Sequence, residues 1–508
     1  MTIQNHNLDQ ITGWLKQQAP AGRMSADSRR IETGDIFMAL LTHQGDGRDY
    51  IAQAIERGAA AIVCEADGLQ WNEQWQVPHL AVSGLAAQAA SIAQAWYQHP
   101  AEQMLSVAVT GTNGKTSCTQ WIARALSMLG QDGAVIGTLG TGICRNGQAP
   151  QLTETGFTTP DAVQLQTALA GLRAEGAQTL AIEASSIGLE QGRMQGLHVD
   201  VAVFTNLTRD HLDYHGSMEA YGRAKQMLFD WPQLKAAVLN LDDEFGRQLL
   251  AHLRSTRPQV QIYGYTLQDE EYEGVRVLRA SNFKTSHAGT GFHLDTPSGS
   301  AQVKTQLIGR FNISNVLAVI AVLLSQQLPL TRIVGVVEKL TPVPGRMQLL
   351  GNPGHVMVVI DYAHTPDALE KTLQAVRQVA EERHGQLWCV FGCGGDRDPG
   401  KRPQMGHIAQ IADQVVVTSD NPRTEDPASI ISQIVAGMSI APHVIEDRAK
   451  AILYAIKHAA DADVILLAGK GHETYQDING KKWPFSDEEH ASLALATIAT
   501  HGNMKRGS

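Results

Sequence analysis

The feature that most constrains this 508-residue chain is the segment TGTNGKTS, Thr110 to Ser117. It follows LSVAVT (105–110), an apolar run typical of a buried strand, and precedes a stretch with helical periodicity. A glycine-rich turn between a strand and a helix exposes backbone N–H groups and a helix N-terminus to phosphate. Val109 stands where the general pattern G-x-x-x-x-G-K-[ST] has its first glycine. The sequence therefore predicts a compact variant of a phosphate-binding loop, in which Lys115 neutralises the β and γ phosphates and Thr116 binds Mg²⁺.

Alternating strand and helix patterns run through the rest of the chain. Buried-strand patterns recur at 179–184, 199–205 and 236–240, and 260–305 is more polar and β-like. After LTPVPGRMQ (340–348) the alternation restarts, with strand patterns in VMVVIDYA, LWCVFG, DQVVVTS and ADVILLAG. Such alternation predicts an α/β fold with parallel sheets covered by helices. We expect three domains: 1–102, a central P-loop ATP-binding parallel-sheet domain at 103–340, and a C-terminal Rossmann-like doubly wound domain at 341–508.

Composition excludes several classes of protein. The 51 acidic and 41 basic residues give a net charge of -10, which argues against nucleic acid as a main partner. The five cysteines are scattered, so they indicate structural thiols rather than a disulfide framework. The N-terminus lacks the pattern of a signal peptide, and the longest apolar run, 316–324, is too short to span a bilayer. We expect a cytoplasmic protein without membrane insertion.

Two further stretches carry chemistry beyond the phosphate loop. EASS (183–186) places Glu183 at the end of a predicted buried strand, where it could bind a metal ion or polarise a water molecule. A paired core charge is the alternative. TNLTRDHLDYHG (205–216) contributes His211 and His215, each of which could equally be structural. The base-reading motif N-K-x-D of GTPases is absent, so the loop is not expected to serve a GTPase.

These stretches and several others, in this order, resemble the Mur ligase family, the ATP-dependent enzymes that build the cell-wall precursor peptide. The resemblance covers nearly the whole chain and is closest to the branch that adds diaminopimelate as the third residue. Besides TGTNGKTS, EASS and TNLTRDHLDYHG, it includes AYGRAKQMLF (220–229), GRFNISN (309–315), PVPGRMQ (342–348), DYAHTPDALEKTL (361–373), GCGGDRDPGKRPQMG (392–406), SDNPRTEDP (419–427) and AGKGHETYQ (468–476).

The resemblance implies a role for each matching position. The catalytic residues would be Lys115, Glu183, His211 and Lys225, and Mg²⁺ would be held by Thr116, Glu183, His211 and a CO₂-derived carbamate on Lys225. ATP would contact Gly111, Thr112, Asn113, Gly114, Lys115, Thr116, Ser117, Asn312, Arg346, Asp361 and His364. The UDP-linked substrate would contact Ala26, Ser28, His43, Gln44, Gly45, Thr158, Thr159, Ser185, Gln191 and Arg193, while Phe157 stands where some relatives carry a polar residue. The incoming amino acid would contact Arg397, Asp420, Asn421, Pro422, Arg423, Gly469 and Glu473.

The implied function is ATP-dependent ligation of meso-2,6-diaminopimelate to UDP-N-acetylmuramoyl-L-alanyl-D-glutamate in peptidoglycan synthesis. The reaction would run through an acyl phosphate and give the UDP-muramoyl tripeptide, ADP and phosphate. The enzyme would be an amide-forming acid–amino-acid ligase that acts as a monomer on small molecules. The sequence DNPR (420–423) favours diaminopimelate, because a guanidinium at Arg423 can bind the distal carboxylate that L-lysine lacks.

Three alternatives stay open. The first is a lysine-adding ligase of the same family, and the second is a folylpolyglutamate synthase, against which the segment SADSR (25–29) and DNPR argue. The third, from another class, is a non-catalytic P-loop ATP-binding scaffold. The carboxylate, histidine and lysine set beyond the loop argues against it, because ATP binding alone would not require that set.

Overall fold

The computed structural model describes residues 7–42, 45–286, 288–351 and 355–506. The chain forms two compact units, each assembled from separate stretches of sequence. The first comprises 1–110, 126–202 and 227–235, and the second comprises 111–125, 203–226 and 236–508.

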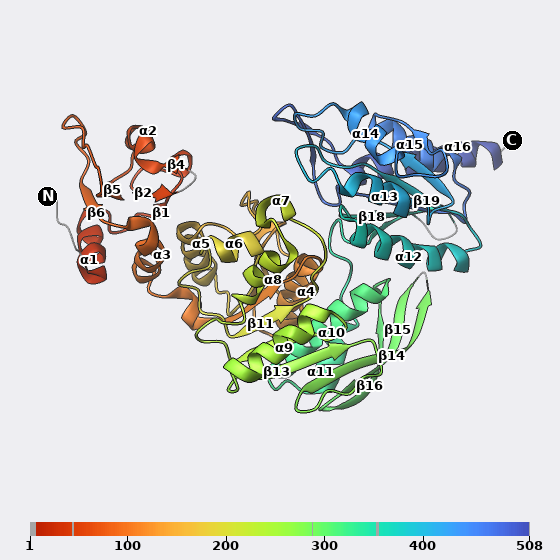
Figure 1. Ribbon diagram of the computed structural model, residues 1–508, viewed down its shortest axis with the longest axis horizontal. Coiled ribbons are helices and arrows are strands. Elements are labelled where there is room, and N and C mark those ends of the chain that lie inside the picture. The colour runs from red at the N-terminus through yellow and green to blue at the C-terminus, as the bar shows by residue number, and fades with distance from the viewer. Residues whose placement is uncertain (1–6, 43–44, 287, 352–354, 507–508) are drawn as a thin grey trace. The chain divides into compact units, whose positions relative to one another are not determined.

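The N-terminal part of the first unit is a small parallel sheet with strand order β1-β2-β5-β6. All residues of β2 and β5 are buried. Both faces of the sheet are apolar, and α1 and α3 pack on one of them (Figure 1). The elements are α1 (Leu8–Gln18), β1 (Met24–Ser25), β2 (Ile36–Ala39), β3 (Leu41–Thr42), β4 (Gly45–Asp46), α2 (Ile51–Glu56), β5 (Ala61–Glu65), β6 (His79–Val82) and α3 (Leu85–Trp96), with single 3₁₀ turns at Ser28–Arg30, Gly47–Tyr50 and Pro100–Gln103.

Four strands in the remainder of the first unit lie side by side in the order β7-β10-β8-β9. The strand predicted before the phosphate loop is β7, and it pairs in parallel with β10, so that Val109 is opposite Glu183. The register therefore places the Glu183 carboxylate at the same sheet edge at which the chain enters the loop. The elements are β7 (Leu105–Thr110), β8 (Gly133–Gly137), β9 (Gly140–Cys144), α5 (Ala162–Ala174), β10 (Thr179–Glu183) and α6 (Ser186–Glu190).

In the second unit, the phosphate loop leads into α4 (Lys115–Met128), whose last residues belong to the first unit. The β-like character of 260–305 is confirmed: β13 pairs in parallel with β12, and β14, β15 and β16 continue as an antiparallel meander. Helix α10 is buried along most of its length, as its continuous apolar sequence predicts. The elements are β11 (Val201–Phe204), which spans the boundary between the units, α7 (Leu212–His215), α8 (Met218–Gln226), β12 (Ala236–Asn240), α9 (Glu244–Thr256), β13 (Gln261–Thr266), β14 (Arg276–Ser286), β15 (Gly289–Thr296), β16 (Gly299–Thr305), α10 (Arg310–Ser325) and α11 (Leu330–Val337).

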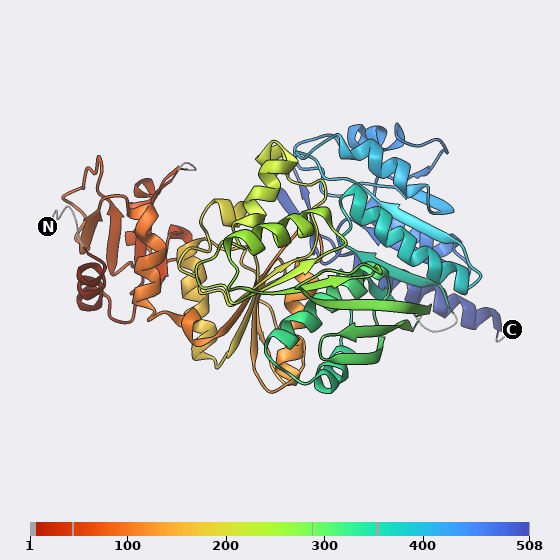
Figure 2. The same cartoon turned by 60° about the horizontal axis from the view of Figure 1, so that its bottom comes forward.

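The C-terminal part of the second unit is a sheet with strand order β17-β18-β22-β19-β20-β21. Only β17 is antiparallel to its neighbour, which confirms the doubly wound pattern. Helices α12, α13 and α14 pack on one face and α15 and α16 on the other (Figure 2). The elements are β17 (Gln348–Leu350), β18 (Met357–Asp361), α12 (Pro366–Glu382), β19 (Leu387–Phe391), α13 (Lys401–Ala409), β20 (Gln414–Val417), α14 (Pro427–Val435), β21 (His443–Val444), α15 (Arg448–His458), β22 (Val464–Ala468), the hairpin β23 (Tyr475–Ile478) and β24 (Lys481–Pro484), and α16 (Asp487–Arg506).

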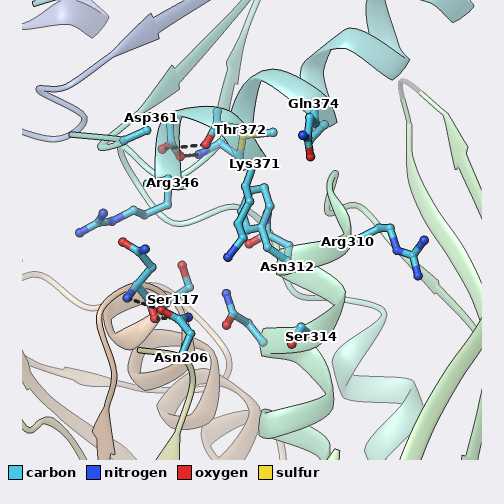
Figure 3. Close-up of a pocket in the computed structure, with 18 of the residues that line it drawn as sticks. Ser117, Asn206, Arg310, Asn312, Ser314, Arg346, Asp361, Lys371, Thr372 and Gln374 are labelled. Carbon is cyan, nitrogen blue, oxygen red and sulfur yellow. Dashed lines mark hydrogen bonds between the residues drawn. The ribbon is translucent and has the colours of Figure 1, made fainter. Parts of the chain in front are cut away.

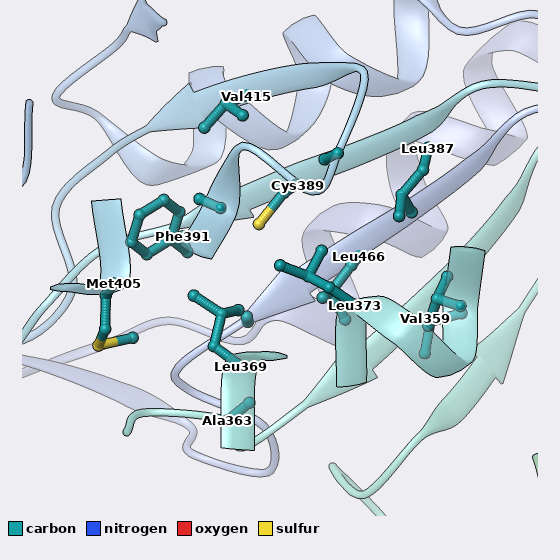
Figure 4. Close-up of a cluster of buried hydrophobic side chains, with 14 of the residues drawn as sticks. Val359, Ala363, Leu369, Leu373, Leu387, Cys389, Phe391, Met405, Val415 and Leu466 are labelled. Atoms are coloured by element: carbon teal, nitrogen blue, oxygen red, sulfur yellow. The ribbon is translucent and has the colours of Figure 1, made fainter. Parts of the chain in front are cut away.

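Local sequence explains how α12 begins, and a buried cluster explains where it lies. The Thr365 hydroxyl accepts a hydrogen bond from the Ala368 N–H, and Pro366 occupies the first turn, where no amide donor is needed. Leu369 and Leu373 of the helix then pack on strand residues such as Phe391 (Figure 4). This core holds the start of α12 next to the loop that follows β18.

Two of the sequence-based exclusions concern features that the structure describes. All five cysteines are buried, and burial raises the pKa of Cys64, Cys389 and Cys393 to about 12, as expected of structural thiols. Within the described ranges, no helix is both long enough and apolar enough to cross a membrane.

Candidate functional site

The phosphate-binding loop has the backbone conformation that its glycines permit. Gly111 and Gly114 have φ values of +147° and +87°. A side chain at Gly111 would collide with the Thr205 hydroxyl, and one at Gly114 would lie 2.6 Å from the Asn315 side chain. Only glycine fits these two positions, because both the dihedral angle and the packing exclude a Cβ atom. The side chain of Asn206 holds the loop by accepting from the Asn113 N–H at 2.9 Å.

Two lysines meet at one carbonyl of this loop. Lys115 Nζ donates to the carbonyl oxygens of Gly111 at 3.0 Å and Thr112 at 2.9 Å. Lys225 Nζ, from helix α8, donates to the same Gly111 oxygen at 2.9 Å. Burial, and then the nearby positive charge of Lys115, hold the pKa of Lys225 well below its ordinary value. The lowered pKa favours the neutral amine form of Lys225, next to the residues predicted to hold phosphate.

His211 and His364 both lie close to the Asp210 carboxylate. His211 has a φ of +53° and precedes helix α7. Its Nε2 atom lies 3.5 Å from Asp210 Oδ2, and His364 Nε2 lies 3.9 Å from the same oxygen. Burial lowers the pKa of both histidines, that of His364 to about 4, although Asp210 opposes the shift. Neutral imidazoles are the form that can coordinate a metal ion or accept a hydrogen bond.

A cavity of about 370 Å³ opens beside the loop within the second unit. Its wall includes Asn113, Gly114 and Ser117 of the loop together with the predicted Asn312, Arg346 and Asp361. Figure 3 shows side chains entering it from α10 and α12 as well as from the loop region. Several other residues line the cavity without having been predicted from the sequence, namely Asn206, Asn240, Asp242, Asp243, Arg310, Ser314, Lys371, Thr372 and Gln374. Five of these, Asn206, Arg310, Ser314, Lys371 and Thr372, lie inside the motifs quoted above, and Gln374 directly follows one, so membership of a motif was the available signal.

Arg346 and Asp361 connect the C-terminal segment to this cavity. Arg346 Nη2 donates to the Thr116 hydroxyl at 3.3 Å, and its guanidinium lies 4.4 Å from the ring centre of Tyr362. The Asp361 carboxylate, at the end of β18, accepts from the Met347 N–H at 2.8 Å. Burial raises the pKa of Asp361, although the charge of Arg346 opposes the shift. Two adjacent residues of the segment 342–348, Arg346 and Met347, thus bond the phosphate loop and the end of β18 respectively.

In the first unit, the residues expected to hold the UDP-linked substrate form a hydrogen-bonded cluster around Glu183. Thr159 Oγ1 donates to the Glu183 carbonyl at 2.7 Å and lies 3.0 Å from the Ser185 hydroxyl. Arg193 Nη1 donates to the Thr159 carbonyl at 3.0 Å, and its Nη2 donates to Gln191 Oε1 at 2.7 Å. The guanidinium of Arg193 also lies 5.0 Å from the ring centre of Phe157, so an apolar residue there stacks on the arginine rather than adding a polar contact.

The Glu183 carboxylate itself is oriented by a residue that the sequence analysis missed. Both of its oxygens accept from Thr138, one from the backbone N–H at 2.9 Å and the other from the hydroxyl at 2.9 Å. The same hydroxyl lies 3.1 Å from that of Thr158. Glu183 is buried, so these bonds provide hydrogen-bond partners for both oxygens of its carboxylate at the end of β10.

The structure describes some of the N-terminal residues that are predicted to contact the UDP-linked substrate. Ser28 is buried, and its hydroxyl donates to Gln53 Oε1 at 2.6 Å. Ala26 is half-buried and Gly45 is exposed. His43 and Gln44 lie outside the described residues.

The residues predicted for the incoming amino acid gather where β20 and β22 end. Asn421 Nδ2 donates to Glu473 Oε2 at 2.8 Å, although the two residues are 52 positions apart in sequence. Arg423 has a φ of +51°, and its Nη1 donates to the Gly395 carbonyl at 2.6 Å. Gly469, with a φ of +111°, leaves no room for a Cβ beside the Asp420 carboxylate. Pro422 is buried between Asn421 and Arg423.

Arg397 differs from the rest of this set. It is exposed, and its side chain forms no hydrogen bond or ion pair with any residue that the structure describes. By contrast, two fully buried cations that the sequence analysis passed over belong to the cluster. Lys470 bonds Asn421 and Glu473, and Arg448 Nη1 lies 3.9 Å from Asp420 Oδ2. Lys470 is part of the quoted segment AGKGHETYQ, which was the available signal.

No three His, Cys, Asp or Glu side chains converge as a metal-binding cluster anywhere in the described ranges. The predicted Mg²⁺ set does not depend on such a cluster, because only Glu183 and His211 in it are of these types. The hydroxyl of Thr116 and oxygens carried by a modified Lys225 would complete it with hard ligands, which suit Mg²⁺.

Family models and individual proteins both match this arrangement. The Mur ligase middle domain matches residues 109–323, the Mur ligase glutamate ligase domain matches 345–471, and the Mur ligase family catalytic domain matches 22–97. The UDP-N-acetylmuramoyl-L-alanyl-D-glutamate–2,6-diaminopimelate ligase of Janthinobacterium sp. (strain Marseille) is 57% identical over 498 residues, which are 97% of this chain and 98% of that protein. The chain belongs to the Mur ligase family. The three successive matches confirm the predicted three-domain α/β fold of this Mur ligase.

Solved structures agree with this assignment. A structure of UDP-N-acetylmuramoyl-L-alanyl-D-glutamate–2,6-diaminopimelate ligase is 37% identical, covers 94% of this chain and 95% of its own, and superposes with a TM-score of 0.64. The folylpolyglutamate synthase of Mycobacterium tuberculosis superposes with a TM-score of 0.60 over 75% of this chain and 92% of its own, at 18% identity. That second likeness concerns the fold alone.

Proposed function

We propose that this Mur ligase joins meso-2,6-diaminopimelate to UDP-N-acetylmuramoyl-L-alanyl-D-glutamate with hydrolysis of ATP to ADP and phosphate. The proposal rests on one observation: the segments DNPR (420–423) and GKGHE (469–473) lie together at the ends of β20 and β22. There Asn421 bonds Glu473, while Arg423 supplies a cation on the neighbouring loop. The 57% identity to a diaminopimelate ligase over 97% of the chain supports the choice of amino acid.

The chemistry begins at the phosphate loop. A carboxylate oxygen of the glutamyl residue attacks the γ-phosphorus of ATP, the bond to the β–γ bridging oxygen breaks, and ADP leaves. Both reactants are anionic, so the attack needs positive charge between them. Lys115 supplies a fixed charge from the first turn of α4, and the loop N–H groups face the phosphates. The product is an acyl phosphate.

The second step forms the amide. The neutral amine of the amino acid attacks the acyl carbon, the tetrahedral oxyanion collapses, inorganic phosphate leaves and the nitrogen loses a proton. Water would destroy the acyl phosphate, so the site must be closed while the amine arrives. The hydrogen bond from Arg346 to Thr116 fits a role for the segment 342–348 in bringing the C-terminal residues to the loop.

Mg²⁺ and a carbamate on Lys225 belong to the proposal. Bound Mg²⁺ would neutralise charge on the transferred phosphate and polarise its oxygens. Carbamate forms when a neutral amine attacks CO₂ and loses a proton, and the lowered pKa of the buried Lys225 favours the neutral amine. We propose Thr116, Glu183, His211 and the carbamate of Lys225 as the metal ligands.

The remaining assignments follow the same reasoning. The cavity beside the loop, lined by Asn312, Arg346 and Asp361, suits the nucleotide. The cluster around Glu183 that contains Thr159, Ser185 and Arg193 suits the UDP-linked dipeptide. We further propose boundaries at 102/103 and 340/341 for the three domains, and a monomer acting in the cytoplasm. Sedimentation of the purified protein and fractionation of cells would test these last two points.

The decisive experiment for the substrate is an amino-acid panel in a ligation assay with mass detection of the product. We expect kcat/KM for meso-diaminopimelate to exceed that for L-lysine by roughly a hundredfold or more, because lysine lacks the distal carboxylate that would balance the charge of the Arg423 guanidinium. Arg423→Ala should remove most of this preference. Arg332→Ala, on the exposed part of α11, is the matched control and should keep it.

Two outcomes would count against the assignment. A wild-type ratio near one, or a preference for lysine, would favour the lysine-adding alternative. ATP binding without phosphate release, in the presence of both the UDP-linked dipeptide and any amino acid of the panel, would favour the non-catalytic alternative.

A further inference from the structure

Lys470 places an ammonium group in the interior of the C-terminal part of the second unit. Its side chain is 0% exposed, and it lies two residues after the end of β22. The glycines on either side, Gly469 and Gly471, have φ values of +111° and +52°, so the backbone turns sharply around the lysine. Burying an ammonium is costly unless charged or polar partners compensate. The partners of Lys470 are therefore informative about its function.

Those partners are two of the residues proposed to hold the incoming amino acid. Lys470 Nζ donates to Asn421 Oδ1 at 3.0 Å and to Glu473 Oε2 at 2.9 Å. Asn421 Oδ1 also accepts from the Asp477 N–H at 3.0 Å, and Asn421 Nδ2 donates to Glu473 Oε2 at 2.8 Å. The four groups form one closed hydrogen-bonded set.

This set fixes the orientation of the Asn421 amide. The amide oxygen faces two N–H donors, from Lys470 and Asp477, and the amide nitrogen faces the Glu473 carboxylate. In the flipped orientation the NH₂ group would face the two donors and the oxygen would face the carboxylate, and neither arrangement forms hydrogen bonds. One hydrogen of Nδ2 is used on Glu473, and the second can donate to a ligand. Of the two donors to Asn421 Oδ1, Lys470 is the charged one, so its hydrogen bond is stronger than that from the neutral Asp477 N–H.

The same set fixes Glu473. Both hydrogen bonds described for its carboxylate end on Oε2. Its side chain is 16% exposed. The second oxygen, Oε1, is the one left to accept from an ammonium. The positive charge of Lys470 balances the negative charge of Glu473, so a zwitterionic amino-acid group, with one ammonium and one carboxylate, meets no net charge here.

We propose that Lys470 is a positioning residue for the incoming amino acid, acting through Asn421 and Glu473. Asn421 Nδ2 donates to a carboxylate of the zwitterion, Glu473 accepts from its ammonium, and Lys470 holds both in place without touching the substrate. This inference rests on the proposed function. Without Lys470, the Asn421 amide loses its charged donor and Glu473 presents an uncompensated charge to the carboxylate of the amino acid.

The test is the steady-state kinetics of Lys470→Met, which keeps a similar length and removes the charge. We expect the KM for diaminopimelate to rise about 10- to 100-fold, the loss typical of a charged hydrogen bond. The KM values for ATP and for the UDP-linked dipeptide should stay within about twofold, because neither substrate is proposed to meet this set. Lys481→Met, an exposed lysine on the adjacent strand β24, is the matched control and should behave as wild type.

A double mutant separates positioning from independent binding. Because Lys470 acts in part through Glu473, Lys470→Met combined with Glu473→Gln should raise the KM for diaminopimelate by less than the product of the two single effects. Multiplied effects would contradict the proposal. Lys470→Gln keeps a neutral donor to Asn421, so its KM for diaminopimelate should rise by less than that of Lys470→Met. If Lys470→Met does not fold, the KM of Lys470→Gln for diaminopimelate serves as the test instead.

The other outcomes are equally clear. An unchanged KM for diaminopimelate in a folded variant, or an equal rise in all three KM values, would overturn the positioning role. Failure of the wild-type enzyme to ligate diaminopimelate is a different result, since it would overturn the proposed function and this inference with it.

Discussion

The buried ion pair between Arg448 and Asp487 gives the sharpest prediction on stability. Both side chains are 0% exposed, and the guanidinium makes two parallel bonds of 2.7 Å to the carboxylate. It also donates to the Ala468 carbonyl at 2.9 Å. Burial alone lowers the pKa of Arg448, but Asp487 more than offsets this and raises it above the ordinary value. The Arg448 guanidinium therefore stays charged in the folded protein.

Arg448→Met should break this pair and leave the Asp487 carboxylate buried without its partner. Removing one member of a buried pair typically costs about 3 to 5 kcal/mol, which is a large fraction of an ordinary domain stability of about 5 to 15 kcal/mol. The double change Arg448→Met with Asp487→Leu removes both charges and should recover most of the loss, because no uncompensated charge remains. Urea unfolding followed by circular dichroism measures all three proteins.

The same substitution should also weaken amino-acid binding. Arg448 Nη1 lies 3.9 Å from Asp420 Oδ2, so its loss removes positive charge from behind a residue proposed to contact the substrate. The double variant should keep this kinetic defect even when its stability recovers. A cost below about 1 kcal/mol for Arg448→Met, or a double variant as unstable as the single one, would refute the reasoning about the buried pair.

Two further predictions concern single side chains. Lys225→Ala should lose most ligase activity, and short carboxylates such as formate should restore part of it; full activity in the variant, with no bicarbonate dependence in the wild type, would exclude the carbamate. Burial and then the charges of Arg346 and Lys470 lower the pKa of His472 to about 3, against 6.5 in an unfolded chain. The neutral ring therefore contributes fully to the free energy of unfolding above pH 6.5, and this contribution is lost as the pH falls towards 3. His472→Gln should therefore gain about 2 kcal/mol in free energy of unfolding relative to wild type between pH 8 and pH 5, and an unchanged difference would show that folding does not lower the pKa of the ring.

Much of the local structure could be predicted because the information lies within a few residues. The run LSVAVT became β7 with the predicted bounds, Leu105–Thr110, and AAVLN became β12, Ala236–Asn240. The glycines of the loop fall where φ is positive, and the Thr365–Pro366 pair begins α12. Alternation of strand and helix patterns was enough to predict parallel sheets, since the crossover between parallel strands requires a helix on one face.

The meeting of distant residues was decided by the tertiary structure. β22, late in the sequence, lies in the sheet between β18 and β19, so the segments after β20 and β22 reach the same edge. This order brings Asn421 to Glu473 and buries Lys470 between them, which no spacing along the chain indicated. In the same way, Lys225 meets the Gly111 carbonyl across 114 positions. Strand order and burial depend on the packing of the whole sheet, and the pKa of a lysine depends on that burial. The sequence alone could therefore name the motifs, whereas only the fold determined which of their side chains touch and in which ionisation state.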